Sequence, residues 1–441
     1  MAAETIAALA TPPGRGGIAI IRISGPGAEA ALRAVFVPAD HKQEYDSHLM
    51  RYGKVVHGDE MLDEGMAVLM RAPRSYTRED VAEIHLHAGE YVVERVMELL
   101  WSLGVTPAHP GEFTKRAFLN GRLDLSRAEA VMQLINASGQ RSAKAAIRDL
   151  QGGSSAFIRQ AQEELLDILA GVAAALDYPE EIEEGEVTPG LLQKAEVLAH
   201  RLLSACDERG ARILEHGLEV VIIGKPNVGK SSLLNLLLKE ERAIVTPEAG
   251  TTRDIVRGSL MIDGIRVNLS DTAGIRQSTG QVEEIGIKRA LQALEAADLV
   301  LAVLDAASIL SSEDEDVLAR VRPYPHLLII NKDDLRVQAD LPRGIRISAK
   351  TGEGLAQLKQ AIAGFAGHPG EGALTNARHM QLARRAAGSL RQAAEAMRRA
   401  EPLDLCAVDL HEALYTLGEV TGDQVSQDLL DRVFSQFCVG K

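Results

Sequence analysis

The chain has 441 residues, of which 46% are hydrophobic and 25% are charged, so it has the composition of an ordinary globular protein with two or three domains. Its net charge of −14 argues against a generally basic nucleic-acid-binding surface, and its 3% of aromatic residues argue against a platform for stacking bases. Three scattered cysteines exclude a disulfide framework, and the chain shows neither a signal-peptide pattern nor an apolar run of membrane-spanning length, so we expect a cytoplasmic protein.

The first part of the chain, residues 1–118, mixes short β-rich runs with turns. The runs 17–24 and 81–86 are typical of strands, and the stretch 91–103 is typical of a helix. We therefore expect an α+β N-terminal domain that spans residues 1–118.

Two later stretches, 119–215 and 368–441, have the composition and the 3.6-residue spacing of helices. An acidic run at 180–186 lies between two prolines, and we expect it to be a solvated loop. Neither stretch has another obvious partner for its apolar face, so we expect the two to pack together as one all-α domain. The segment between them would then be an inserted domain.

The inserted segment, 216–367, alternates predicted strands and helices, which is typical of a doubly wound α/β sheet. Its residues 224–231 read Gly-Lys-Pro-Asn-Val-Gly-Lys-Ser and lie between a predicted strand and a predicted helix. In such a loop the backbone N–H groups face phosphate oxygens at a helix N-terminus. Lys230 adds positive charge near the outer phosphates and Ser231 can ligate Mg²⁺. A nucleoside triphosphate is the predicted ligand.

Three further motifs follow in the order that a GTPase requires. Asp271–Gly274, at a strand end, can hold Mg²⁺ through water and sense the γ-phosphate. Asp334 can accept hydrogen bonds from N1–H and the 2-amino group of guanine, and adenine lacks donors in that arrangement. The segment 348–350 can donate a backbone N–H to guanine O6. Alone, the Asn-Lys-Asp-Asp motif at 331–334 would be interpreted as a polar turn, but the ordered set predicts a Ras-like G domain.

The catalytic group is less evident, because Ile275 occupies the position at which Ras-type GTPases carry a water-orienting glutamine. Glu283, at the start of the next predicted helix, is a candidate for that role. The residues leave open the alternative that Glu283 is an ordinary acid at a helix N-terminus. Thr252 is expected to close on Mg²⁺ and the γ-phosphate as part of a switch loop. Asn227 is a candidate ligand of a monovalent cation.

The residues that we expect to contact GTP lie in the phosphate loop, the switch loop and the three later motifs. They are Asn227, Val228, Gly229, Lys230, Ser231, Ser232, Thr246, Pro247, Glu248, Ala249, Gly250, Thr251, Thr252, Asp271, Thr272, Ala273, Gly274, Asn331, Lys332, Asp334, Ser348, Ala349 and Lys350. Ser231 and Thr252 are the expected Mg²⁺ ligands.

Motifs along the whole chain resemble those of one family. These motifs are the segments 5–17, 22–25, 110–124 and 250–254, and the final Cys-Val-Gly-Lys at 438–441. The chain resembles the tRNA modification GTPase family MnmE, also called TrmE. The resemblance spans residues 5 to 441 with the motifs in family order.

The resemblance implies that the N-terminal domain forms a homodimer and binds a tetrahydrofolate one-carbon donor, either 5,10-methylene- or 5-formyl-tetrahydrofolate. The implied folate contacts are Arg22, Glu83, Arg122 and Lys441. Position 122 departs from the usual lysine of the family. Arginine keeps the positive charge of lysine, but its planar guanidinium group donates hydrogen bonds in a fixed geometry that an ammonium group does not have, so this contact is the least secure of the four.

For the G domain the resemblance implies a K⁺ ion held by Asn227, Thr246, Glu248 and Thr251, and it implies that Glu283 positions the attacking water. The implied partner is the FAD- and NADH-using MnmG (GidA) flavoprotein, in a heterotetramer. Together the two proteins would add a carboxymethylaminomethyl or aminomethyl group at C5 of the wobble uridine of certain tRNAs.

The alternative that we weigh is a ribosome-assembly or other RNA-binding GTPase without modification chemistry. The N-terminal block with its folate-type residues argues against it. An arginine-rich helix at 378–399 is either a tRNA contact or a solvated face. Cys438 is either a thiol nucleophile or a packing residue, and its setting fits a prenylation signal poorly.

Overall fold

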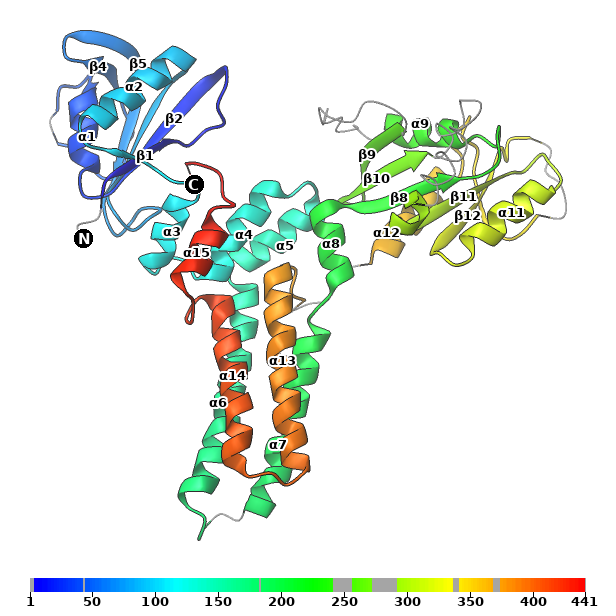
Figure 1. Cartoon of the computed structure of the whole chain (residues 1–441). Helices are drawn as coiled ribbons and strands as arrows, with labels where there is room; N and C mark the ends of the chain where they lie inside the picture. The colour runs from blue at the N-terminus through cyan, green and yellow to red at the C-terminus, as the bar shows by residue number, and fades with distance from the viewer. Residues whose placement is uncertain are drawn as a thin grey trace, which may run out of the picture. The chain divides into compact units, whose positions relative to one another are not determined.

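The computed structural model describes residues 4–42, 44–181, 184–240, 256–271, 292–335, 341–367 and 373–440 (Figure 1). The chain divides into two compact units. One comprises Met1–Met132, Asp149–His200 and Arg385–Lys441, and the other comprises Gln133–Arg148 and Arg201–Arg384. No helix in the described part of the chain has the length and apolar character needed to cross a membrane.

The first unit begins with a seven-stranded sheet in the order β3-β4-β5-β6-β2-β1-β7, antiparallel except for the pairing of β1 with β7. Its strands are β1 (Ile6–Leu9), β2 (Gly16–Ser24), β3 (Phe36–Pro38), β4 (Arg51–His57), β5 (Glu60–Met70), β6 (Val81–Ala88) and β7 (Thr106–Pro107). Helices α1 (Ala28–Val35) and α2 (Glu90–Ser102) cover one face, where Ile21, Ile23 and Ile84 are buried with Leu32 and Leu100.

Side chains alternate across a strand, so the neighbours of those buried isoleucines lie on the opposite face of the sheet. Arg22 on β2 is the direct cross-strand partner of Glu83 on β6. Two residues that lie 61 positions apart are thus held side by side by strand register alone.

The rest of the first unit is helical. Its helices include α3 (Glu112–Leu119), α4 (Leu125–Asn136), α6 (Gly153–Asp177), α14 (Leu403–Thr421) and α15 (Gln427–Phe434). Helices α6 and α14 lie side by side (Figure 1), and both bury apolar stripes that include Ile158, Leu165, Leu410 and Leu417. Segments from either side of the inserted domain therefore pack together, as expected.

Helices α7 (Glu184–Ser204) and α13 (Ala377–Arg398) run through both units, and the ends of α4 and of α5 (Gln140–Leu150) also cross the boundary between them. The prediction of a loop over 180–186 is wrong from Glu184 onward, because α7 already begins there and includes Pro189. Proline at this position removes only the hydrogen bond to the carbonyl of residue 185, close to the helix start, where the loss is small.

The second unit holds a six-stranded sheet in the order β13-β12-β11-β8-β10-β9, parallel except for the β9–β10 hairpin. Its strands are β8 (Leu218–Ile223), β9 (Val256–Ile262), β10 (Ile265–Asp271), β11 (Leu299–Asp305), β12 (His326–Asn331) and β13 (Ile345–Arg346). Its helices include α5 (Gln140–Leu150), α8 (Glu208–His216), α9 (Lys230–Glu240), α11 (Ser312–Val321) and α12 (Leu355–Ala366).

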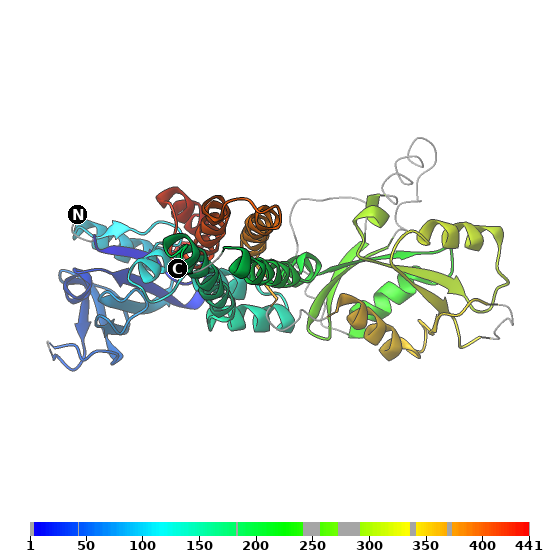
Figure 2. The same cartoon turned by 90° about the horizontal axis from the view of Figure 1, so that it is seen from below.

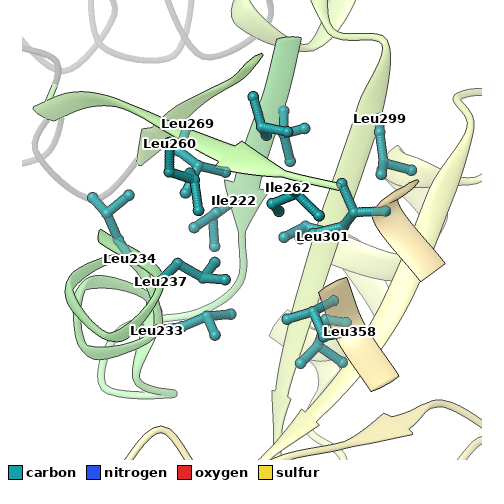
Figure 3. Close-up of a cluster of buried hydrophobic side chains, with 14 of the residues drawn as sticks. Ile222, Leu233, Leu234, Leu237, Leu260, Ile262, Leu269, Leu299, Leu301 and Leu358 are labelled. Atoms are coloured by element: carbon teal, nitrogen blue, oxygen red, sulfur yellow. The ribbon is translucent and has the colours of Figure 1, made fainter. Parts of the chain in front are cut away.

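Helices cover both faces of this sheet (Figure 2). On one face Leu233, Leu234 and Leu237 of α9, together with Leu358 of α12, point toward Ile222 and its neighbours on the strands (Figure 3). On the other face α11 packs through Val321. The central strands β8 and β11 are buried on both faces, which explains their continuous apolar sequences, whereas β10 alternates buried and half-buried residues. The predicted doubly wound α/β domain is confirmed.

Candidate functional site

The phosphate-binding loop leaves β8 at its carboxyl end and enters α9. Asn227 and Gly229 have φ angles of 66° and 95°, in the left-handed region. A Cβ atom on Gly229 would lie 2.2 Å from Nδ2 of Asn331, so only glycine fits there. The tight wrap turns successive backbone N–H groups inward, which makes an anion-binding concavity.

Two polar side chains at the start of α9 close this loop. Lys230 is 7% exposed, and its Nζ donates a hydrogen bond of 2.8 Å to the carbonyl oxygen of Lys225. The Ser231 hydroxyl donates a hydrogen bond of 2.8 Å to Oδ2 of Asp271, at the carboxyl end of β10. The two groups expected to hold Mg²⁺, one directly and one through water, therefore lie together.

Asn331 joins the phosphate loop to the base-recognition loop. Its side-chain amide donates a hydrogen bond of 2.8 Å to the carbonyl oxygen of Val228, and its amide oxygen accepts one of 2.9 Å from the backbone N–H of Ala349. Asn331 is only 1% exposed, and its bond to Val228 is made away from water, while the bond from Ala349 is partly buried. The Ser348 hydroxyl donates a bond of 2.7 Å to one carboxylate oxygen of Asp334, which fixes that carboxylate beside the same loop.

Two aspartates that the sequence analysis did not identify hold lysines of this site in place. Asp305, at the end of β11, accepts a hydrogen bond of 2.6 Å from Lys332. Asp314, on α11, accepts one of 2.6 Å from Lys225 and completes a capping box with Ser311. The Ser-x-x-Asp spacing is a recognisable helix-start signal, so Asp314 had a local cue. Its link to Lys225 had none, because the two lie 89 positions apart.

The carboxyl groups of Asp305 and Asp314 are ionised at neutral pH. Burial acts to raise the pKa of each aspartate, but hydrogen bonds and charge from its lysine, together with other hydrogen bonds, hold the pKa below the ordinary value. Both carboxylates therefore stay charged and keep Lys225 and Lys332 in place.

The structure gathers thirteen of the residues expected to contact GTP at the carboxyl edge of this sheet. They are Asn227, Val228, Gly229, Lys230, Ser231, Ser232, Asp271, Asn331, Lys332, Asp334, Ser348, Ala349 and Lys350. The other expected residues lie outside the described part of the chain. They are Thr246, Pro247, Glu248, Ala249, Gly250, Thr251, Thr252, Thr272, Ala273 and Gly274, with the catalytic candidate Glu283 and the folate candidate Lys441.

A second polar site lies in the first unit, on the face of the N-terminal sheet opposite α1 and α2. Arg22 donates a hydrogen bond of 2.8 Å to Oε1 of Glu83, and His85 contacts Oε2 of the same carboxylate at 3.3 Å. The bond to His85 and the charge of Arg22 outweigh burial and lower the pKa of Glu83. Glu83 is thus a carboxylate with a cationic partner on a half-open sheet surface.

Two aromatic rings complete this second site. The guanidinium carbon of Arg22 lies 5.6 Å from the ring centroid of Tyr76 and 5.8 Å from that of Phe113. The guanidinium carbon of Arg122 lies 4.6 Å from the Tyr76 centroid. The structure therefore brings together three of the four predicted folate residues. It adds Tyr76 and Phe113, for which the sequence spacing held no signal because they come from separate segments, and His85, which strand alternation places on the same face as Glu83.

The C-terminal segment reaches the same site. Arg22 donates a hydrogen bond of 3.3 Å to the carbonyl oxygen of Gly440, and the backbone N–H of Gly111 donates one of 3.3 Å to that of Cys438. Gly440 has a φ of 92°, and a Cβ there would lie 2.3 Å from the carbonyl oxygen of Leu9. Glycine is thus required for the segment to lie against β1. Cys438 is exposed beside this site.

The arginine-rich helix α13 is extensively ion-paired. Arg384 pairs with Glu208, Arg385 with Glu412 and Glu419, and Arg398 and Arg399 both with Glu395. Charges that are already paired release less free energy on meeting a phosphate backbone. This favours the interpretation of α13 as a solvated face.

Comparison with known proteins gives consistent matches. A family model described as the MnmE helical domain matches residues 125–438, and one described as the GTP-binding protein TrmE N-terminus matches residues 5–122. Proteins named tRNA modification GTPase MnmE from Listeria innocua and Carboxydothermus hydrogenoformans are 43% and 44% identical to this chain. The first match covers 99% of both chains and the second covers 100% of both. The protein of that name from Synechococcus sp. CC9605 is 46% identical, over 99% of both chains.

Among solved structures, Era from Aquifex aeolicus in a GDP·AlF4⁻ complex is 32% identical, over 33% of this chain and 56% of its own, with a TM-score of 0.28. The G domain of FeoB from T. maritima is 27% identical, over 34% of this chain and 98% of its own, also with a TM-score of 0.28.

Proposed function

The chain belongs to the tRNA modification GTPase MnmE family and is a GTP-hydrolysing enzyme, and from that premise we propose the particular reaction that it serves. We propose that it hydrolyses GTP with the help of K⁺. With an MnmG-like, FAD-dependent partner it adds a carboxymethylaminomethyl or aminomethyl group to C5 of the wobble uridine of certain tRNAs, using a tetrahydrofolate one-carbon donor.

The observation that carries the nucleotide part of the proposal is the pair of bonds made by the buried Asn331 amide. These bonds hold the phosphate loop and the base loop in one rigid arrangement. GTP would lie with its phosphates on the N–H groups of the loop and beside Lys230. Its guanine would lie against Asp334 and the backbone N–H groups of 348–350.

The residues present fit a Mg²⁺ ion. The Ser231 hydroxyl and the Asp271 carboxylate are hard oxygen donors that lie 2.8 Å apart beside the phosphate loop. Ser231 would bind the ion directly, with Thr252, and Asp271 would bind it through water. Bound there, Mg²⁺ neutralises charge on the phosphates during transfer. The protein's own contribution is to orient these oxygens before the nucleotide arrives.

Potassium and the catalytic glutamate rest on the family resemblance. Asn227 would provide one K⁺ ligand, together with Thr246, Glu248 and Thr251. Its left-handed backbone, φ 66°, supports a special local role, because non-glycine residues rarely adopt that conformation without a compensating contact. Glu283 would position the attacking water.

The open face of the N-terminal sheet fits a folate. A tetrahydrofolate carries a planar ring system with hydrogen-bond donors and an anionic glutamate tail. Glu83 can accept hydrogen bonds from ring N–H groups, and the guanidinium groups of Arg22 and Arg122 can pair with carboxylates. Lys441 would add a further cation. These are few polar groups set among aromatic rings, as small-molecule sites commonly are.

We propose that the protein acts as a cytoplasmic homodimer within a heterotetramer, with tRNA as substrate. Since arginines of α13 are ion-paired, we propose that the flavoprotein partner makes most of the contacts to tRNA. Cys438 is exposed beside the folate residues. The exposed side chain of Cys438 does not fit the packing role, and the role of thiol nucleophile stays a prediction.

The experiment that tests the proposal is mass spectrometry of tRNA nucleosides from a strain that lacks this protein. Wobble uridines should lose the C5 substituent and regain it when the chain is supplied. The Glu283→Ala variant should bind GTP, fail to turn it over and fail to restore the modification. GTP turnover should drop when Na⁺ replaces K⁺. Unchanged wobble uridines in the deletion strain would refute the modification function, and equal rates in Na⁺ would refute the K⁺ assignment.

A further inference from the structure

One aromatic ring in the first unit contacts both arginines of the proposed folate site. The guanidinium carbons of Arg22 and Arg122 lie 5.6 and 4.6 Å from the ring centroid of Tyr76. Both distances are within the range in which a cation is attracted to the electron-rich face of an aromatic ring. Arg22 comes from β2 and Arg122 from the segment after α3, so only the fold brings the two cations to this ring.

Tyr76 is anchored through its hydroxyl and binds Arg122 through its backbone carbonyl. Its hydroxyl lies 2.9 Å from Oγ1 of Thr114, a residue of α3 that is fully buried. At the backbone, the carbonyl oxygen of Tyr76 accepts a hydrogen bond of 3.0 Å from Nη1 of Arg122. Arg122 is therefore fixed twice by one residue, once through the ring and once through the carbonyl.

The two arginines differ in what else holds them. Arg22 has its salt bridge to Glu83 and its bond to Gly440. Arg122 is exposed, and Tyr76 provides both of the contacts described for its guanidinium group. An exposed arginine loses rotamer entropy when it is ordered on a ligand, and a side chain that is already stacked loses less. Tyr76 thus contributes most at position 122, where this chain carries arginine and not the usual lysine.

We propose that Tyr76 is a positioning residue of the folate site, which orders the guanidinium group of Arg122, and with it that of Arg22, so that both face the anionic part of the ligand. This inference rests on the proposed function, since it assumes that the ligand is a folate. With Nη1 donating to the Tyr76 carbonyl and Cζ held over the ring, the remaining N–H groups of Arg122 are available for a carboxylate. The Arg122–Tyr76 pair would therefore replace the function of the family lysine and not merely its charge.

The test is the affinity of the purified full chain for 5-formyltetrahydrofolate, measured by calorimetry. Replacing Tyr76 by leucine removes the ring, and affinity should fall roughly tenfold because two cation–aromatic contacts are lost. Tyr76→Phe keeps the ring and should bind within about threefold of the native protein. This rescue by phenylalanine separates positioning by the ring from any effect of the hydroxyl.

A double-mutant cycle that combines Tyr76→Leu with Arg122→Met tests whether Tyr76 acts through Arg122. If Tyr76 acts through Arg122, the double variant should lose clearly less than the roughly hundredfold expected from two independent tenfold effects. Circular dichroism and thermal unfolding of each variant are the folding control, and GTP affinity, whose site lies in the other unit, should stay unchanged in every variant. If the leucine variant does not fold, Tyr76→Met replaces it in the same cycle.

The possible results are distinct. Weaker binding with leucine, rescue by phenylalanine and a non-additive cycle support the proposal. If the native chain binds 5-formyltetrahydrofolate and the leucine variant binds it equally well, or if phenylalanine is as harmful as leucine, or if the cycle is additive, the positioning role is overturned while the folate site stands. If the native chain binds neither 5-formyl- nor 5,10-methylene-tetrahydrofolate, the folate part of the proposed function fails and the inference fails with it.

Discussion

Asn331 is the residue on which both loops of the nucleotide pocket depend. Its amide bonds to the carbonyl of Val228 on one side and to the N–H of Ala349 on the other. If the side chain were shortened, the buried carbonyl of Val228 and the partly buried N–H of Ala349 would both lose this bond, and an unsatisfied buried group costs about 1–3 kcal/mol.

We therefore expect Asn331→Ala to lower GTP affinity by about 10- to 100-fold and to lower the free energy of unfolding by about 2 kcal/mol. Fluorescent-nucleotide titration and urea denaturation would measure the two effects. Asn235→Ala, on an exposed position of α9, is the matched control and should change neither quantity. Native-like GTP affinity in Asn331→Ala would show that the two loops are positioned without this amide.

Glu83 makes the N-terminal sheet sensitive to acid. The hydrogen bond to His85 and the charge of Arg22 lower the pKa of Glu83 from its ordinary value of 4.5. A lowered pKa means that the folded state binds the proton more weakly than the unfolded state does. The stabilisation by the carboxylate is therefore complete above about pH 4.5 and is lost as the pH falls through the folded pKa.

The expected result is that native protein exceeds Glu83→Gln in unfolding free energy at pH 7 and that the gap narrows below about pH 4.5. Urea denaturation of both proteins between pH 7 and pH 3 measures it, and taking the difference cancels the other carboxylates. Glu94→Gln, at an exposed position on α2, should show no such gap. A gap that widened as the pH fell would reverse the assignment.

Individual residues were predictable where function depends on a continuous motif. The phosphate loop, Asp271, Asn331 and Asp334 stand at strand ends that a run of apolar residues already marks. Tyr76 and Asp305 were missed because their partners are distant in sequence and are brought close only by the fold. No local pattern records a contact of that kind.

At the scale of elements, the link between the phosphate loop and α11 is the least expected feature. Lys225 reaches Asp314, whose side chain is only 4% exposed, and the same carboxylate caps the start of α11. The loop is thus tied to a helix that contributes no predicted nucleotide contact. The phosphate-loop pattern allows any residue at the second position of the loop, but here Lys225 has a structural role because it pairs with Asp314.

Replacing Lys225 by methionine would leave the Asp314 carboxylate buried without its cation. We expect a loss of about 3 kcal/mol in unfolding free energy and a several-fold faster release of GDP, because the loop is no longer tied to α11. Adding Asp314→Asn removes the unpaired charge and should recover part of the stability but not the slow release. Thermal unfolding and stopped-flow nucleotide exchange measure the two effects, and an unchanged release rate in Lys225→Met would contradict the coupling.

Element prediction succeeded for part of the regular structure and failed for the rest, including the seven-residue β4 and the eleven-residue β5, which were not predicted. The predicted strands at 17–24 and 81–86 correspond to β2 and β6, and the predicted helix at 91–103 corresponds to α2. The two- and three-residue strands β3, β7 and β13 were not predicted, since so few residues carry no periodicity. They exist because a neighbouring strand offers them free backbone groups.

At the scale of the whole molecule, the two proposed ligands belong to different compact units. Binding stabilises the part of a protein that holds the ligand, by about 2.7 kcal/mol at a ligand concentration 100 times the Kd. We expect GDP with Mg²⁺ to slow amide hydrogen exchange in β8 and α9, and 5-formyltetrahydrofolate to slow it in β2 and β6. Exchange followed by mass spectrometry with each ligand in turn measures this. Slowing of β2 and β6 by GDP as strong as by the folate would contradict separate sites.

The insertion of one domain into another was visible in the sequence, because helical periodicity stops near residue 216 and resumes near 368. The sequence did not show that α7 and α13 pass through both compact units. A continuous helix has the same pattern whether one unit or two pack against it.

The bond from Arg22 to Gly440 joins residues that lie 418 positions apart. A ribosome that adds 5–20 residues per second makes Arg22 roughly 20–80 s before it makes that partner. The N-terminal sheet has its own core, yet its polar face is completed only when residue 440 has been translated. Nascent and truncated chains would thus lack a finished site. Binding of a ligand at that site would therefore require that translation had reached the segment around Gly440.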